Sequence, residues 1–236
     1  MNEILAGISS MATRALLVEL CAAYERAGGT QIRFESVGGV DAMKRVRGGE
    51  PFDLVVLAAD AIDGLAKTGS VYGDSRSALV NSEVAIAVPT GAARPDISSE
   101  PALRSVVLDA RGVGYSTGPS GKALIELFAR WGVTEELKEK LVLAPPGVPV
   151  ATLVTGGQAS VGFQQFSELV DLPGVVVLGL MPPGLEIVTT FVGAIGIASR
   201  HIEAARAALA FMRSPDMNKL KQRHGMSEPL ISAFPS

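Results

Sequence analysis

Short runs of strand character alternate with segments of helical periodicity in the first part of the chain, and this alternation limits the folds open to it. Residues 4–8, 31–35 and 54–58 predict strands. Between them, residues 12–27 place apolar side chains at helical spacing and end at two glycines, and residues 40–47 predict a shorter helix. Strands that alternate with helices are typical of an α/β fold with a mainly parallel sheet.

The same alternation continues after a loop rich in Pro, Gly and Ser, and it predicts a second unit. A strand is expected at 84–88, before this loop. After it, strands are expected at 112–115, 141–143, 161–163 and 175–178, and helices at 121–131, 135–140 and 149–155. An extended, β-branched segment, 187–197, then leads to two amphipathic helices, 201–212 and 216–224. We therefore expect residues 86–193 to form a domain inserted into a discontinuous domain of residues 1–85 and 194–236.

The composition excludes several classes of function. The 236 residues carry 21 Lys and Arg against 24 Asp and Glu, a net charge of −3, whereas a nucleic-acid partner requires a basic surface. One cysteine, Cys21, and two histidines, His201 and His224, leave too few side chains for a zinc centre or a disulfide framework. We expect no metal ion and no other cofactor.

The sequence also bears on membranes and location. No stretch is long and apolar enough to predict insertion into a bilayer. Met1, Asn2 and Glu3 lack the cationic start of a secretory signal, which favours a cytoplasmic location. An exported protein whose signal has been trimmed would begin in the same way, and for that form the expected location is the periplasm.

Three predicted strands run into turns rich in Gly and Ser that open helices. A helix start presents unpaired N–H groups and the positive end of a dipole, glycine allows close approach, and hydroxyl groups add donors. Each turn taken alone also fits an ordinary helix cap. Three on alternating strand ends of one chain predict a site for an oxyanion or carboxylate, formed by Ser9, Ser10, Gly38, Gly39, Ser116, Thr117, Ser120 and Gly121.

Further polar residues follow two strands of the second unit. Gln164 and Gln165 end the strand predicted at 161–163, where their amides could bind a carboxylate, or serve as polar loop residues. Tyr115 ends another strand and needs a hydrogen-bond partner if it is buried. Lys122 either adds charge to an anion site or is a solvated lysine of a first helical turn. It is not part of a nucleotide-binding P-loop, because two positions of that motif do not match.

Two segments resemble a known family. Pro51-Phe52-Asp53-Leu54-Val55-Val56-Leu57-Ala58-Ala59-Asp60, with the strand that ends in two serines, resembles the first lobe of type 2 periplasmic solute-binding proteins. Leu153-Val154-Thr155-Gly156-Gly157-Gln158-Ala159-Ser160-Val161-Gly162-Phe163 is similar to a segment of that family's second lobe. The molybdate-binding branch is the most similar. The resemblance implies two α/β lobes, two crossover strands and a central ligand cleft that holds an anion.

The chain departs from the molybdate-binding pattern at two places. Ser9 or Ser10 matches the first serine of that pattern, but the second serine pair falls on Gly38 and Gly39. The tyrosine of the second lobe falls near Gln164 and Gln165. Open glycine turns and amides favour a larger organic anion over tetrahedral molybdate.

A third set of residues resembles a sub-branch that includes aconitate isomerase: 114–121, 145–150 and 162–165. This resemblance implies movement of a double bond within a tricarboxylate. Such a reaction needs a base, for which Glu168, Lys122 and Tyr115 are candidates, and hydrogen-bond donors, but no cofactor. The alternative is a non-catalytic binder of molybdate or another small anion. That binder would be either a transport receptor with an ABC permease as its partner or a cytoplasmic sensor.

Overall fold

The computed structural model describes residues 4–170 and 172–229, and the chain divides into two compact units. Unit 1 comprises Met1–Ser82 with Thr189–Ser236, and unit 2 is Glu83–Val188. The chain leaves unit 1 within strand β4 (Ser77–Pro89) and returns within strand β9 (Val188–Ile195). The boundaries expected from the sequence, after residues 85 and 193, lie a few residues further along these same strands.

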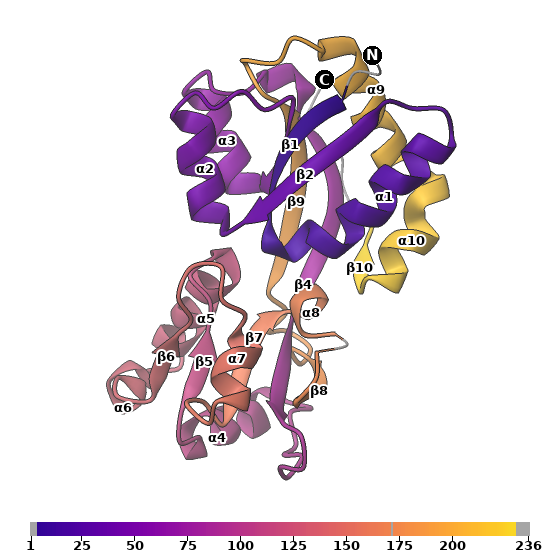
Figure 1. Ribbon diagram of the computed structural model, residues 1–236. Coiled ribbons are helices and arrows are strands. Elements are labelled where there is room, and N and C mark those ends of the chain that lie inside the picture. Colours follow the sequence, from indigo (N-terminus) through magenta and orange to yellow (C-terminus); the bar gives the residue numbers. More distant parts are fainter. Residues whose placement is uncertain (1–3, 171, 230–236) are drawn as a thin grey trace. The chain divides into compact units, whose positions relative to one another are not determined.

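Unit 1 is an α/β unit whose mixed sheet has the strand order β2-β1-β3-β9-β4, with β10 paired to β4 (Figure 1). Strands β1, β2 and β3 are parallel, whereas β9 runs antiparallel to β3. Besides β4 and β9, its strands are β1 (Ile4–Ser10), β2 (Gln31–Val37), β3 (Leu54–Ala58) and β10 (Met226–Ser227). Its helices are η1 (Met11–Thr13), α1 (Arg14–Arg26), α2 (Gly39–Arg47), α3 (Ala59–Lys67), η2 (Gly73–Ser75), α9 (Ile202–Arg213), η3 (Pro215–Met217) and α10 (Asn218–Arg223).

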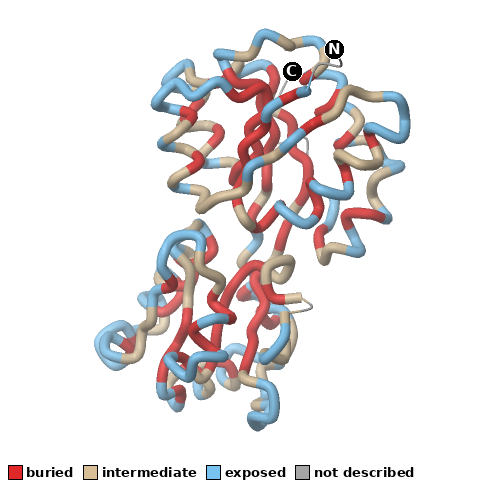
Figure 2. Tube along the Cα trace, in the orientation of Figure 1, coloured by how far each residue is buried: buried red, intermediate tan, exposed pale blue. Residues whose placement is uncertain are grey.

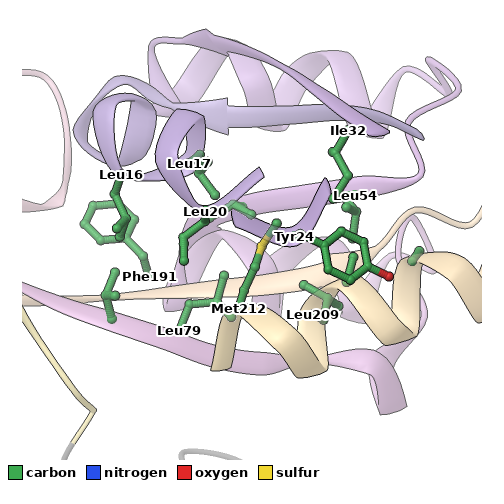
Figure 3. Close-up of a cluster of buried hydrophobic side chains, with 14 of the residues drawn as sticks. Leu16, Leu17, Leu20, Tyr24, Ile32, Leu54, Leu79, Phe191, Leu209 and Met212 are labelled. Atoms are coloured by element: carbon green, nitrogen blue, oxygen red, sulfur yellow. The ribbon is translucent and has the colours of Figure 1, made fainter. Parts of the chain in front are cut away.

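Helices cover both faces of this sheet because successive side chains of a strand point to opposite sides. In β3, Leu54 and Val56 belong to the apolar cluster with α1, α9 and α10, whereas Val55 and Leu57 belong to the cluster with α2 and α3. Figure 2 shows the resulting line of buried residues along the strands. In Figure 3, side chains of α1 such as Leu20 meet Met212 of α9 in the first of these clusters.

Unit 2 is built in the same way around a smaller sheet of order β4-β7-β5-β6, with β8 also paired to β4. Strands β5, β6 and β7 are parallel, and β7 and β8 run antiparallel to β4. Its other strands are β5 (Val113–Tyr115), β6 (Leu141–Leu143), β7 (Val161–Gln165) and β8 (Val175–Leu180). Its helices are α4 (Glu100–Asp109), α5 (Pro119–Arg130), α6 (Thr134–Leu137), α7 (Val150–Thr155) and α8 (Phe166–Leu169).

The sheet of unit 2 also has a core on each face. Ile86 of β4 and Phe163 of β7 pack with side chains of α4, α5 and α6. The alternate residues Ala85 and Ala87 of β4 pack with Ala151 of α7 and with α8. The two faces of β7 therefore lie against different sets of helices, which decides where its polar residues point.

The α/β class expected from the sequence is confirmed, but three details were wrong or missed. The sheets are mixed rather than mainly parallel, because β4 and β9, which carry the chain between units, run against their neighbours. Helices α3, α4 and α8, the short strand β10 and residues 77–83 of β4 were not predicted. Strands β1, β2 and β7 extend two residues beyond the ends expected for them, so that Ser9, Ser10, Gln164 and Gln165 belong to strands. Within residues 4–170 and 172–229, no helix is long and apolar enough to cross a membrane.

Candidate anion site

The carboxyl ends of three parallel strands meet at one edge of unit 1. Ser9 of β1 lies beside Ser36 of β2 in register, and beside Val56 of β3. Each strand then runs into a helix: β1 into η1 and α1, β2 into α2, and β3 into α3. This edge brings together Ser9 and Ser10, as predicted, with the start of α2 at Gly38 and Gly39. In open α/β sheets this edge is where ligands bind.

Three serine hydroxyls gather at this edge. Ser9 is fully buried, and its Oγ donates to the carbonyl oxygen of Ser10 at 3.2 Å. Its Oγ also lies 2.8 Å from Oγ of Ser36. A hydroxyl has one proton to donate, so Ser36 is the donor to Ser9. The hydroxyl of Ser9 is thus hydrogen-bonded within the protein at this edge. Ser36 was missed as its partner because the register of β1 against β2 is not visible in the sequence.

Ser10 differs from Ser9 because its hydroxyl is buried without a partner. The residue is only 8% exposed, and its Oγ makes no hydrogen bond among the described residues. A Cβ added to Gly39 would lie 3.8 Å from Cβ of Ser10, so this hydroxyl sits beside the first turn of α2. A buried hydroxyl without a partner costs free energy that a bound oxyanion would recover.

The helix starts at this edge add further donors. Gly38 caps α2 and Ala58 caps α3, and neither provides a side-chain oxygen to the free N–H groups of the first turn. Unpaired N–H groups and the positive helix end favour a bound anion. Each first turn also carries one acid, Asp41 in α2 and Asp60 in α3, which offsets part of that positive potential.

In unit 2, the turn between β5 and α5 brings the predicted hydroxyls together. Oγ of Ser116 lies 3.3 Å from Oγ of Ser120, which is buried at the start of α5, and Thr117 between them is exposed. A Cβ added to Gly121 would lie 1.8 Å from the carbonyl oxygen of Ser116. Only glycine therefore allows the turn to close on the helix in this way.

The two amides that end β7 point to opposite faces of the sheet. Gln164 is buried on the side of α7 and α8, where its Oε1 accepts a 2.7 Å hydrogen bond from the N–H of Val150. Gln165 is buried as well and pairs with Val84 of β4 in the antiparallel register. Both are strand residues rather than the polar loop residues of the other interpretation.

Glu168 lies one turn beyond β7, on the short helix α8. Burial raises the pKa of its carboxyl from the ordinary value of 4.5 to about 7, and a hydrogen bond from the side chain of Gln164 offsets part of that rise. A carboxyl group with a pKa near 7 exchanges its proton at neutral pH, as a general base must. Glu168 was predicted as a candidate, but the elements that desolvate it could not be identified from the sequence.

The other two candidate bases have different surroundings. The side chain of Lys122 is 81% exposed and lies 4.0 Å from Glu126, one helical turn further along α5. Tyr115 is half-buried at the edge of the apolar cluster under α4 and α5, and Gly121 lies close to its ring. Among the three candidates, Glu168 is the one whose carboxyl group is desolvated by its surroundings.

Two other titratable groups serve the structure of unit 1. The carboxylate of Asp53 accepts hydrogen bonds from the N–H of Ala6 at 2.9 Å and the hydroxyl of Ser199 at 2.7 Å, and lies 3.2 Å from Nδ1 of His201. Burial raises the pKa of the Cys21 thiol to about 12, which keeps it protonated and unreactive. In the part of the chain that the structure describes, no group of three or more His, Cys, Asp or Glu is placed to hold a metal ion.

Known proteins share both the sequence pattern and the fold. The sequence model of the bacterial extracellular solute-binding proteins matches residues 5–227. Aconitate isomerase from a Pseudomonas species is 35% identical over 225 residues, which are 93% of this chain and 86% of that protein.

Two solved structures have the same two-lobe fold. The periplasmic molybdate-binding protein of Azotobacter vinelandii aligns with a TM-score of 0.78 and 16% identity, over 95% of this chain and 99% of that one. The sulfate-binding protein SubI of Mycobacterium tuberculosis aligns with a TM-score of 0.74 and 19% identity, over 95% of this chain and 86% of that one. At these identities the two structures bear on the fold alone.

Proposed function

The chain belongs to the family of bacterial extracellular solute-binding proteins, and we propose that this member binds a small unsaturated polycarboxylate and moves its double bond without a cofactor. The identity with aconitate isomerase, over most of both chains, supports an isomerase of this kind. The ligand is a small anion, in keeping with the donors at the strand ends of each unit.

The observation that carries the proposal is the carboxyl group of Glu168. A protein that only holds an anion gains nothing from a nearby carboxylate, because like charges repel. A carboxyl group whose pKa is about 7 is suited instead to take up and release a proton at neutral pH. This property favours an enzyme over a receptor.

In the proposed reaction, ionised Glu168 removes a proton from the allylic carbon beside a carboxylate of the substrate. The electron pair of the broken C–H bond spreads onto that carboxylate and, through the double bond, onto the carboxylate at the far end of the three-carbon unit. A proton then adds at the far end of the three-carbon unit, and the double bond has moved by one position with no net oxidation. Hydrogen-bond donors that face the carboxylate stabilise the charge as it develops.

Each unit has donors of this kind at its strand ends. In unit 1 they are the hydroxyl of Ser10 and the N–H groups at Gly38, Gly39 and the start of α3. In unit 2 they are the turn at 116–121 and the amide of Gln165. In our proposal, donors that bind the remote carboxylates hold the substrate while the reacting carboxylate is polarised.

Incubation with trans-aconitate tests the proposal. Proton NMR should show conversion to the isomer with the shifted double bond, at the same rate with and without EDTA, because a base and hydrogen-bond donors are sufficient. Calorimetry should show binding of trans-aconitate and no binding of molybdate. Tight binding of molybdate, with neither binding nor conversion of trans-aconitate, would contradict the proposal.

A non-catalytic receptor for a small anion is the second candidate, and the family match together with the molybdate-binding fold supports it. In that case an ABC permease is the partner and the periplasm is the location. A cytoplasmic location accompanies the enzyme, since an isomerase needs no permease.

Replacing Ser10 with alanine separates binding from stability. Ser10→Ala should weaken trans-aconitate binding about tenfold, because a hydrogen bond to a charged group contributes about 1.5–3 kcal/mol. The free energy of unfolding in urea should stay constant or rise, because the lost hydroxyl has no partner in the free protein. Ser105→Ala, an exposed hydroxyl in α4, is the control. Unchanged affinity in Ser10→Ala would remove this residue from the site.

A further inference from the structure

The side chain of Gln164 is occupied at both ends inside unit 2. It lies on the face of β7 that packs against α7 and α8 and is 2% exposed. Its Oε1 accepts the N–H of Val150, at the start of α7, and its amide group forms a hydrogen bond with the carboxyl of Glu168. Both the oxygen and the nitrogen of the amide are thus engaged within unit 2, whereas the sequence predicts that this amide binds a ligand.

The hydrogen bond to Val150 fixes which end of the amide faces Glu168. A backbone N–H can only donate, so it selects the oxygen of the Gln164 side chain. The NH2 group is then the end that meets Glu168, and it can only donate to a carboxylate oxygen. The orientation of the amide is therefore set by the first turn of α7, and the amide in turn holds the carboxyl group.

The elements packed around Glu168 are almost free of charged residues, so the contact with Gln164 matters for the ionisation of its carboxyl group. Helix α8 packs against β7 and β8, with Ala151 of α7 in the same apolar cluster. None of α7, β7 and β8 carries a charged residue, and the one charged residue of β4 is Glu83. Among the described residues, the side chain of Gln164 is the group that favours the ionised form of Glu168 against desolvation.

We infer that Gln164 is a positioning residue, whose amide links the first turn of α7 to Glu168 and holds that carboxyl group ionised and oriented for proton transfer. The inference rests on the proposed role of Glu168 as the base. It predicts that Gln164 affects the chemical step and hardly affects substrate binding.

Two substitutions test the link. Gln164→Met removes both hydrogen bonds at a similar side-chain length. Gln164→Glu keeps an oxygen acceptor for Val150 and replaces the donor to Glu168 with a second carboxyl group, which also disfavours the ionised form of Glu168. In both, the midpoint of the Glu168 titration, followed by carbon NMR of labelled glutamate, should rise by about one pH unit. At pH 7, kcat should fall about fivefold with KM within about threefold of the wild-type value, because less of the base is ionised.

The matched control is Gln158→Glu, the same chemical change at an exposed position of unit 2, which should leave the titration and kcat unchanged. If Gln164→Met lowers only the melting temperature and neither variant moves the Glu168 midpoint, the amide is merely structural and the inference is overturned. A rise in KM without a change in kcat would overturn it too, in favour of ligand binding. Absence of isomerisation in the wild type would refute the proposed function alone, since the NMR titration does not depend on turnover.

Discussion

Replacing Glu168 with glutamine is expected to lower kcat for trans-aconitate isomerisation about a hundredfold or more, the usual contribution of a positioned base. The amide fills the same space but cannot accept the allylic proton. Binding of trans-aconitate should be retained or tightened, because the substitution removes a negative charge near an anion. Steady-state kinetics and calorimetry on the same preparation measure the two effects.

The role of Glu168 as the base also predicts how kcat depends on pH. Because the pKa of Glu168 is about 7, kcat should rise with pH through that region as the carboxyl group ionises, and fall as the pH is lowered. Residual activity of Glu168→Gln should lack this dependence. Glu135→Gln, whose side chain is 89% exposed on α6, is the matched control and should behave as the wild type. Wild-type kcat in Glu168→Gln would show that another residue is the base.

The second large effect is expected from Gly121→Ala. Alanine normally stabilises a helix by about 1 kcal/mol relative to glycine. At this position the new Cβ would lie 1.8 Å from the carbonyl oxygen of Ser116, so the backbone must move. We expect a loss of about 1–3 kcal/mol in the free energy of unfolding, as in overpacked cores, and at least about a tenfold loss of affinity as the turn at 116–121 opens.

Gly64→Ala provides the opposite case in unit 1. Gly64 lies inside α3, where the nearest atom to an added Cβ is a guanidinium nitrogen of Arg47 at 3.9 Å. This variant should be more stable by up to about 1 kcal/mol, with unaltered affinity. Urea unfolding of both variants compares them directly. If Gly121→Ala is also stabilised and binds normally, the close approach at 116–121 has no role in the site.

The sequence predicts those parts of the fold whose signals are local. The strand–helix alternation and the glycine stops place most elements within a few residues of their observed ends. Helix α3 was missed because it follows β3 directly, at Ala59, without a capping side chain. Helix α4 has a signal that could have been used, since Ser99 caps it and a proline lies in its first turn. The antiparallel course of β4 and β9 depends on partners distant in the sequence.

The candidate site was predicted in its residue types but not in its connections. The hydroxyls of Ser9 and Ser10 look alike in the sequence, yet one is held by Ser36 and the other has no partner among the described residues. Gln164 and Gln165 are neighbours that face different cores, since β7 continues through both. The pKa of Glu168 follows from uncharged elements packed around α8, which only the fold brings together.

Proton exchange with solvent is the most direct measure of the proposed chemistry. Wild-type protein is incubated with trans-aconitate in deuterated water containing EDTA, and the substrate and its isomer are followed by proton NMR. If Glu168 removes an allylic proton, deuterium appears at the allylic carbon as the double bond moves, and both events are slowed about a hundredfold or more in Glu168→Gln. Tight binding of trans-aconitate without deuterium incorporation or isomerisation over hours would contradict the proposal of an enzyme and would favour a receptor.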